Sequence, residues 1–417
     1  MSKISIYLIS VDIHGYFNGV GRHIQVFMND LGNHTNVECY HLSFTQDPSL
    51  LSLRKTRINK RCMRVAIPLP VKYGVLLKDS EALHAYNQEA CELTRRYYAN
   101  KRRRILHVHT LNMMPFALLL KSKIRCKIVS HIHCLSWKYN LAFNPRVFGN
   151  QFEIAAQHNE NEDRSQLFSV LGEKETYNKS DRIICVADCG REFVKYMQGA
   201  DAPFIYMIPN GIRDTFDAMK VERGNGPDRP FVIFFAGGGA KGKGLDLLLD
   251  GVSMLPTRTR KLVEVHVAGI CSASQQSYYK KRYSNTRVVF LGLLNQRELE
   301  EAYYRADLGA IMSLHEQCSY TAIEMMMHQL PIISTDADGL GEMFQHGKNA
   351  SVVPVEYDKG RKVLYTDKNI LAQKLISLIH RPRMREKIGR EGRATFLERY
   401  TAQDMSNKII NLYEDII

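Results

Sequence analysis

Short apolar segments alternate with amphipathic ones through the second half of the chain, and this regular order restricts the fold more than any other feature. Five apolar segments have the length and β-branched content of buried strands: FVIFFAGG (231–238), VEVHVAG (263–269), RVVFLG (287–292), LGAIMS (308–313) and PIIST (331–335). The segments between them place apolar residues at helical spacing, as in 245–252. Strands and helices in alternation predict a parallel sheet with helices on both faces.

The first half shows the same alternation less regularly. Its predicted strands are KISIYLIS (3–10), RILHVHT (104–110), KIVSHIH (127–133) and DRIICVA (181–187). A helix is predicted after the first strand, because apolar residues recur at Ile24, Phe27, Met28 and Leu31. The predicted fold class is therefore α/β, with two doubly wound, Rossmann-like domains.

The expected domains are residues 1–212, residues 213–399 and a C-terminal segment, 400–417. The last segment is predicted to be an amphipathic helix that closes the molecule, against the N-terminal domain. The polar stretch 220–230 is interpreted as a linker or an exposed loop. Ligands of such sheets bind beyond the carboxyl ends of the strands, so the chemistry is expected in the loops that follow strands.

The composition restricts the cellular compartment and the binding partners that are expected for this chain. No apolar stretch approaches the ~20 residues that span a bilayer. The nine cysteines are scattered without zinc-like spacing, which favours reduced thiols in a cytoplasmic protein. The net charge is +14, and residues 51–150 hold 20 Lys and Arg against 4 Asp and Glu. Such a surface favours an anionic partner, and an anionic membrane face is expected to contact residues 54–104. Nucleic acid is not expected, because no recognition motif or interleaved aromatic residues accompany the charge.

Two loops of the second half carry the predicted ligand chemistry. AGGGAKGKG (236–244) joins a strand to a helix, and glycine amides with lysine side chains in that context suit a phosphate. HEQCSYTA (315–322) also precedes a helix, whose N-terminus favours an anion. Glu324 and Glu316 are suited to accept hydrogen bonds from sugar hydroxyls on either side of such a phosphate. Spacing alone leaves open the alternative that Glu324 is a solvated helix residue and Glu316 a charge at the helix N-terminus.

These stretches resemble the retaining GT-B glycosyltransferases of glycosyltransferase family four (glycosyl transferases group 1). The matching segments follow the family's order over most of residues 231–355, and the most specific of them is EQCSYTAIEMMMHQLPIIST (316–335). The first half matches more loosely, in NGVGRH, LHVHT, SHIHC, SDRIICVA and IPNGI. The resemblance implies a GT-B fold and a nucleotide diphosphate sugar as co-substrate, with no cofactor and no metal.

The resemblance also implies roles for individual residues. His133, Glu316 and Lys243 would be catalytic: Glu316 would hold the donor sugar, Lys243 the diphosphate, and His133 would lie at the reacting centre. Glu324 would bind the ribose, while Gly292 and Leu293 would present backbone to the base. The implied donor-binding set is Gly19, Gly21, Gly237, Gly238, Lys241, Lys243, Gly292, Leu293, Glu316, Gln317, Cys318, Ser319, Tyr320, Thr321 and Glu324. The implied acceptor contacts are Asn18, Arg22 and His109.

Two positions depart from the family pattern. Gly238 stands where an arginine is usual, so Lys241 is a candidate to supply the missing charge. Ser319 stands where a glycine is usual. His107 and His109 alternate as metal ligands do, but the sequence shows no third ligand. The pair Asp336 and Asp338 is interpreted as loop structure, not as a metal motif.

The predicted activity is transfer of a sugar, with retention, from a nucleotide diphosphate sugar to a hydroxyl. A glycan or a lipid-linked sugar in surface polysaccharide or glycoconjugate synthesis is the expected acceptor. Two alternatives stay open: a nucleotide-sugar isomerase or epimerase of the same fold, and a protein or peptide glycosyltransferase.

Overall fold

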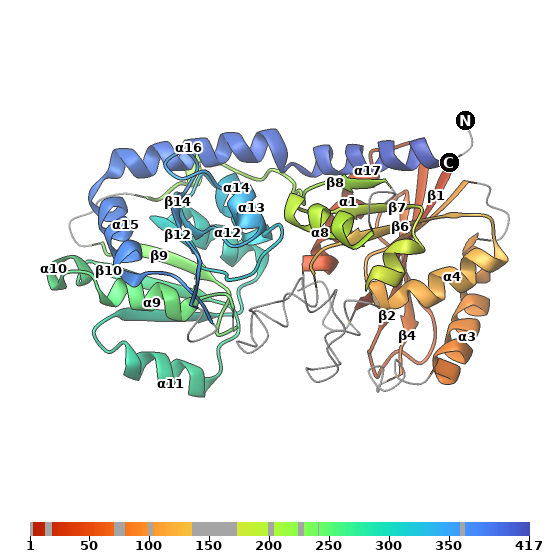
Figure 1. The fold of residues 1–417 in the computed structure, drawn as a ribbon, viewed down its shortest axis with the longest axis horizontal. Helices are drawn as coiled ribbons and strands as arrows, with labels where there is room; N and C mark the ends of the chain where they lie inside the picture. The colour runs from red at the N-terminus through yellow and green to blue at the C-terminus, as the bar shows by residue number, and fades with distance from the viewer. Residues whose placement is uncertain are drawn as a thin grey trace. The chain divides into compact units, whose positions relative to one another are not determined.

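The computed structural model divides the chain into two compact units, each built on its own parallel sheet (Figure 1). Unit 1 comprises Met1–His133, Leu167–Arg213 and Ala402–Ile417, and unit 2 comprises Cys134–Gln166 and Asp214–Thr401. The structure describes residues 3–12, 19–70, 80–98, 103–135, 173–198, 204–223, 229–240, 242–358 and 363–417. The predicted α/β class with two Rossmann-like sheets is confirmed.

Unit 1 has a sheet in the order β3-β4-β2-β1-β5-β6-β7-β8, parallel except for the β3–β4 pair. Its strands are β1 Ile4–Asp12, β2 Val37–Thr45, β3 Arg54–Arg57, β4 Cys62–Pro68, β5 Arg103–Val108, β6 Lys127–Ile132, β7 Arg182–Cys185 and β8 Ile205–Met207. Its helices are α1 Gly19–Leu31, η2 Leu111–Met113, α4 Met114–Lys123, α3 Ser80–Tyr98, α8 Asp188–Gln198 and α17 Ala402–Ile416.

Alternate residues of β1 supply two separate cores, because successive side chains of a strand point to opposite faces. Ile4, Ile6 and Leu8 pack with apolar residues of α1 and α17. Tyr7 and Ile9 pack with residues of α3 and α4 on the other face. The amphipathic C-terminal helix α17 therefore completes a core of unit 1, although more than half of the chain separates it from β1.

Several elements of unit 1 escaped sequence prediction. Strand β2 and helix α3 were not predicted, and the basic segment 54–64 forms part of the antiparallel hairpin β3–β4. A charged, exposed strand such as β3 lacks the apolar pattern from which strands are recognised. Charged residues at a sheet edge also discourage pairing with other chains.

Unit 2 has a sheet in the order β11-β10-β9-β12-β13-β14, and every pair of strands is parallel. Its strands are β9 Phe231–Ala236, β10 Val263–Ala268, β11 Arg287–Gly292, β12 Leu308–Ile311, β13 Ile332–Thr335 and β14 Ser351–Val353, with a separate hairpin of β15 Glu356–Asp358 and β16 Val363–Tyr365. Its helices are η3 Ala218–Lys220, α9 Leu245–Ser253, α10 Thr257–Arg260, α11 Ala273–Arg282, α12 Gln296–Arg305, α13 Tyr320–Met327, α14 Gly339–Met343, α15 Lys368–His380 and α16 Pro382–Arg399. In chain order the sheet reads 3-2-1-4-5-6, the arrangement of dinucleotide-binding sheets.

Helices cover both faces of this sheet (Figure 1). Ile233 and Phe235 of β9 pack in a core with α9 and α15. Phe234, between them, contacts the ring of Tyr303 on α12, with centroids 5.3 Å apart. The stretch interpreted as a linker is partly fixed in place, because Arg223 donates hydrogen bonds to the carbonyls of Tyr303, His328 and Gln329.

Candidate active site

The loops that follow β9 and β12 meet in unit 2, where the strand order reverses. Strand β9 pairs with β10 on one side and with β12 on the other. The amide of Leu314, after β12, donates to the carbonyl of Gly242 in the loop after β9, at 2.9 Å. This is the position at which open α/β sheets bind ligands.

Gly244 permits this close approach. Its φ is +79°, a conformation that side chains of L-residues rarely adopt, and an added Cβ would lie 2.0 Å from the carbonyl oxygen of Met312. A glycine is therefore required where the β9 loop enters α9.

An ion pair joins the two loops. Lys243 Nζ donates to Glu316 Oε2 at 2.7 Å, with the side chains 40% and 17% exposed. The ammonium has two further protons to donate. The carboxylate has further lone pairs that can accept hydrogen bonds from hydroxyl groups. The structure thus brings together two of the three residues that the sequence assigned to catalysis, both reachable from solvent.

Helix α13 begins directly after this pair. Ser319 is its N-cap, with φ of −71°, and its hydroxyl accepts from the amide of Ala322 at 3.3 Å. The serine therefore needs no glycine-like conformation, and its hydroxyl stabilises the helix start. Tyr320 and Thr321 stand in the first turn, where the helix dipole favours an anion.

The other residues of this loop are buried. Gln317 and Cys318 lie in the interior. Glu324 is 3% exposed, and its Oε2 accepts from the hydroxyl of Tyr303 at 2.7 Å. Glu324 is thus not a solvated helix carboxylate, and its contact with a ribose stays a prediction.

The amides of the glycine loop form hydrogen bonds within unit 2. The amides of Gly237 and Gly238 both donate to the carbonyl of Ala268, at 3.0 and 2.9 Å, and the amide of Gly239 donates to Ile270 at 3.0 Å. Ala268 ends β10 and Ile270 follows it, so these amides fix the loop after β9 against β10; a phosphate contact of Gly237 and Gly238 stays a prediction. Lys241 lies outside the described residues, and so does Asn18.

Gly292 and Leu293 end strand β11 on the surface of unit 2. Gly292 has φ of +70°, and its carbonyl accepts from the amide of Gly269 at 2.7 Å. The side chain of Leu293 is 60% exposed, an apolar surface that suits the flat face of a base. Their contact with a base stays a prediction.

The two carboxylates of the DAD stretch serve the local structure. Asp336 Oδ1 accepts from the amide of Val355 at 2.7 Å, and Asp338 pairs with His315. Both contacts agree with the interpretation of this stretch as loop structure.

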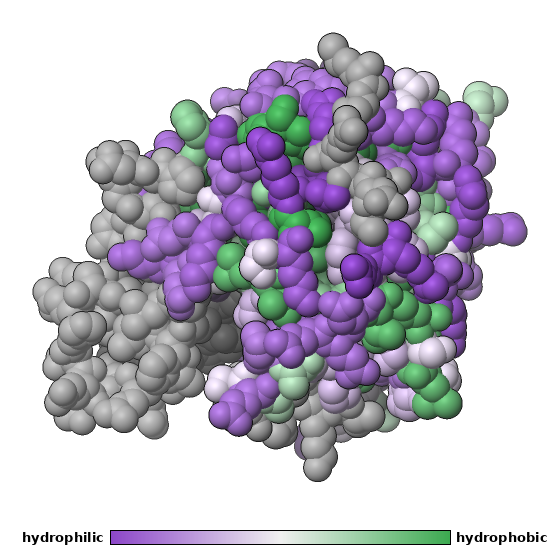
Figure 2. All heavy atoms as spheres, turned by 90° about the vertical axis from the view of Figure 1, so that its right-hand side faces the viewer, coloured by the Kyte–Doolittle hydropathy of each residue, from purple (hydrophilic) through white to green (hydrophobic). Residues whose placement is uncertain are grey.

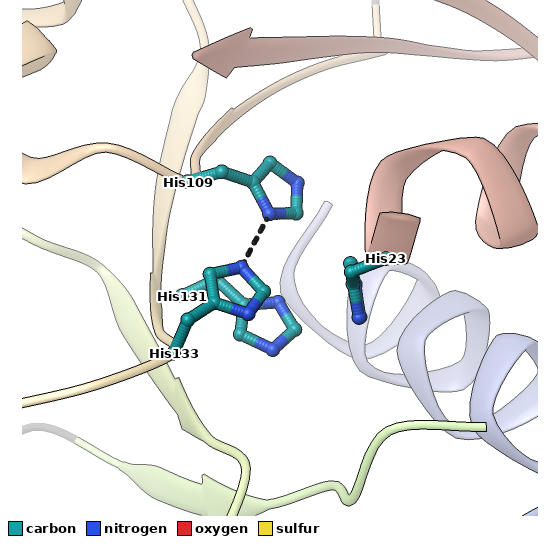
Figure 3. Close-up of side chains that lie close together, drawn as sticks. All are labelled: His23, His109, His131 and His133. Carbon is teal, nitrogen blue, oxygen red and sulfur yellow. Dashed lines mark hydrogen bonds between the residues drawn. The ribbon is translucent and has the colours of Figure 1, made fainter. Parts of the chain in front are cut away.

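In unit 1, Gly19, Gly21 and Arg22 form the first turn of α1. His109 follows β5 and His133 follows β6, and their Nδ1 and Nε2 atoms are 3.0 Å apart. His23 of α1 and His131 of β6 lie beside them (Figure 3). The structure therefore groups His109 with three histidines that the sequence did not connect to it, and His107 is not part of this group.

A signal for this cluster was present in the sequence. Histidines alternate at 107 and 109 and again at 131 and 133, so each pair lies on one face of its strand. Strands β5 and β6 pair in parallel, with Val108 opposite Ser130, which brings the two pairs together. The position of His23 depends on how α1 packs, which no local pattern specifies.

A family model and several known proteins match part of unit 2. Residues 230–381 match the family model described as Glycosyl transferases group 1. The sulfoquinovosyl transferase SQD2 of Arabidopsis thaliana is 26% identical over 196 residues, which are 46% of this chain and 35% of that protein. The matches to this and other curated relatives, such as the mannosylfructose-phosphate synthase of Agrobacterium fabrum, cover less than half of their lengths.

Solved structures match over the full chain. The sucrose-phosphate synthase of Thermosynechococcus elongatus has a TM-score of 0.76 at 17% identity, with 99% of both chains covered. HepE of Anabaena, solved with UDP and glucose, has a TM-score of 0.65 at 15% identity, with 100% of both chains covered. These likenesses show that the fold is GT-B, as the resemblance implied.

Proposed function

We propose that the chain is a retaining glycosyltransferase that moves a sugar from a nucleotide diphosphate sugar to a hydroxyl of an acceptor. The group 1 match of residues 230–381 supports sugar transfer, and the GT-B fold supports a nucleotide-sugar donor. The proposal extends to the first half of the chain, to retention and to membership of family four.

The observation that carries this proposal is the ion pair of Lys243 and Glu316 beside the start of α13. Negative charge develops on the diphosphate as it leaves, and an ammonium and helix amides already aimed at it lower the barrier. The carboxylate of Glu316 accepts hydrogen bonds from hydroxyl groups of the donor sugar. Because these groups supply the positive charge, the reaction needs no metal ion at the diphosphate.

The remaining predicted residues receive roles within the same proposal. Glu324 binds the ribose, and Gly292 and Leu293 contact the base. Gly19 and Gly21 let the first turn of α1 approach the donor phosphate, and Arg22 and His109 contact the acceptor. His133 acts at the reacting sugar, and the leaving diphosphate takes the acceptor proton.

The acceptor is proposed to be a glycan or a lipid-linked sugar at an anionic membrane face. A hollow of about 550 Å³ in unit 1 is lined by Leu53, Glu92, Leu93, Arg95 and Arg96. Figure 2 shows one face of the molecule, on which green hydrophobic patches lie among purple hydrophilic side chains. Apolar side chains beside arginines suit a lipid surface that carries negative charge. Among the described residues, no helix has the length and hydropathy of a membrane span.

Glu316→Ala tests the proposal. One lost charge-assisted hydrogen bond is worth roughly 1.5–3 kcal/mol, so turnover with a nucleotide sugar should fall by about 10- to 150-fold or more. The donor is first identified by the rise in melting temperature that a panel of nucleotide sugars produces, since a ligand of the native state raises its stability. Nucleotide release is then measured with and without acceptor.

Glu301→Ala is the matched control, because Glu301 forms an exposed pair with Arg297 on α12 of the same unit. This variant should keep full turnover and the same melting temperature. Normal turnover in Glu316→Ala would refute the placement of the donor sugar, and nucleotide release that needs no acceptor would instead indicate an isomerase.

A further inference from the structure

Four histidines of unit 1 converge from three elements. His23 comes from α1, His131 from β6, and His109 and His133 from the ends of β5 and β6. One ring nitrogen of each lies within 4.8 Å of one ring nitrogen of every other. Figure 3 shows the rings of His109, His131 and His133 on one side and His23 opposite them.

The hydrogen bonding of this cluster is incomplete. His23 Nδ1 contacts Asn210 Oδ1 at 3.1 Å, and His131 Nδ1 contacts His107 Nε2 at 3.1 Å. The Nε2 atoms of His23 and His131 are buried without a partner. A buried polar atom without a hydrogen-bond partner lowers the stability of the folded protein. These two atoms therefore indicate a ligand that the polypeptide itself does not supply.

We propose that His23, His109, His131 and His133 bind one divalent transition-metal cation, of which Zn²⁺ is the representative. Imidazole nitrogen is a preferred ligand of zinc and of its neighbours in the transition series, whereas magnesium and calcium prefer oxygen. No acidic residue belongs to the cluster, which is a further reason to exclude those two ions.

The geometry needs only side-chain adjustment. Four nitrogens at about 2.0–2.1 Å from a tetrahedral zinc ion stand about 3.3 Å apart. His109 Nδ1 and His133 Nε2, 3.0 Å apart, already have this spacing. The widest separation of 4.8 Å must shorten by about 1.5 Å to reach the zinc spacing.

The surroundings favour the neutral rings that bind metals. Burial lowers the pKa of His23 to about 4 and the pKa values of His109, His131 and His133 well below their usual range. Asn210 and His107 hold the second nitrogens of His23 and His131, and His107 is in turn bonded to the hydroxyl of Tyr413 on α17. Such outer partners orient metal-binding imidazoles.

The site would use the ring nitrogens that the proposed function assigns to acceptor contact and transfer. Cation binding is therefore measured directly and without sugar substrates, so its failure leaves the transfer proposal intact. The full chain, freed of any affinity tag and of metal, is titrated with Zn²⁺ and with Co²⁺. We expect one ion per chain by elemental analysis, a rise in melting temperature and visible absorption from tetrahedral Co²⁺.

His23→Gln and His131→Gln should each weaken binding by at least about 100-fold, since even outer-partner changes cost 10- to 100-fold. His41→Gln is the matched control, because His41 is a buried histidine on strand β2 of the same sheet, outside the cluster. It should bind as the wild type does. Absence of stoichiometric uptake by the wild type, or equal uptake by the two cluster variants, would overturn the proposal.

X-ray absorption of the zinc-loaded wild type covers the case in which the cluster variants do not fold. Three or four imidazole nitrogens at about 2.0–2.1 Å support the site. A first shell of sulfur or carboxylate oxygen means that the ion is bound elsewhere, and the proposal fails.

Discussion

His41 shows how a single buried side chain links the stability of unit 1 to pH. It lies in β2, its Nε2 is 2.8 Å from the hydroxyl of Ser10, and Arg64 on β4 is the nearby charge. Arg64 itself pairs with Asp12 at 2.6 Å. Burial, with a further contribution from Arg64, lowers the pKa of His41 to about 3.

The sign of the pH effect follows from this shift. The unfolded chain binds a proton at His41 below about pH 6.5, whereas the folded chain does not until about pH 3, so stability falls as the pH drops through this window. At pH 5.5 the cost is about 1.4 kcal/mol. His41→Gln should reduce the loss of unfolding free energy between pH 7.5 and pH 5.5 by about this amount, as measured by urea unfolding.

His84→Gln is the control for this measurement, because His84 is exposed on α3. It should leave the pH profile of the wild type unchanged. If the unfolding free energy of His41→Gln depends on pH as that of the wild type does, the folded protein protonates His41 without losing stability, and the prediction is wrong.

Among the connecting segments, the turn from β9 into α9 depends on a single residue type. Gly244 combines φ of +79° with the close approach to Met312. Gly347 has nearly the same φ, +76°, but open space around its Cβ position. An alanine at Gly347 would introduce backbone strain alone, whereas an alanine at Gly244 would introduce the same strain and a steric clash. Comparing the two substitutions therefore distinguishes the two effects.

Gly347→Ala should cost about 1–2 kcal/mol, the usual penalty for a side chain in the left-handed region. Gly244→Ala carries the same strain and also drives a methyl group into the carbonyl of Met312, so it should cost clearly more and weaken donor binding. Calorimetry of both variants measures the difference. Equal melting temperatures would contradict the required contact between the loops after β9 and β12.

The charge of the chain as a whole is concentrated in one part of its sequence. Of the 57 Lys and Arg residues, 20 lie in residues 51–150, where only 4 Asp and Glu offset them. The hollow lined by Arg95 and Arg96 also carries the apolar side chains of Leu53 and Leu93. Attraction between such a surface and anionic lipid weakens as salt is added.

The chain should sediment with vesicles that contain anionic lipid at low salt and should not sediment with neutral vesicles. The double change Arg95→Glu and Arg96→Glu should reduce binding by about 30-fold or more, at about 1 kcal/mol for each basic residue near the surface. Lys387→Glu with Arg390→Glu, on exposed positions of α16, is the control with equal charge change. Equal loss in both pairs would mean that net charge alone, and not this face, attracts the lipid.

Much of the architecture was accessible from local patterns. Apolar periodicity identified all but the last strand of the main sheet of unit 2, because a strand buried on both faces reads as a continuous apolar segment. It failed for β3, whose residues are exposed and charged. Local patterns also did not show that the amides of Gly237 and Gly238 donate to Ala268 of β10, about 30 residues later. Such partners depend on strand order, which no short window of sequence contains.

The sequence by itself determined the alternation of strands and helices, the two-unit α/β fold and the loops in which Lys243 and Glu316 stand. Only the tertiary structure decided that these two side chains, 73 residues apart, form one pair. It also decided that α17 belongs to the first unit and that His23 joins three histidines from β5 and β6. The physical reason is range: periodicity and turn chemistry act between near neighbours, whereas a binding site forms where long-range strand pairing and helix packing bring distant side chains together.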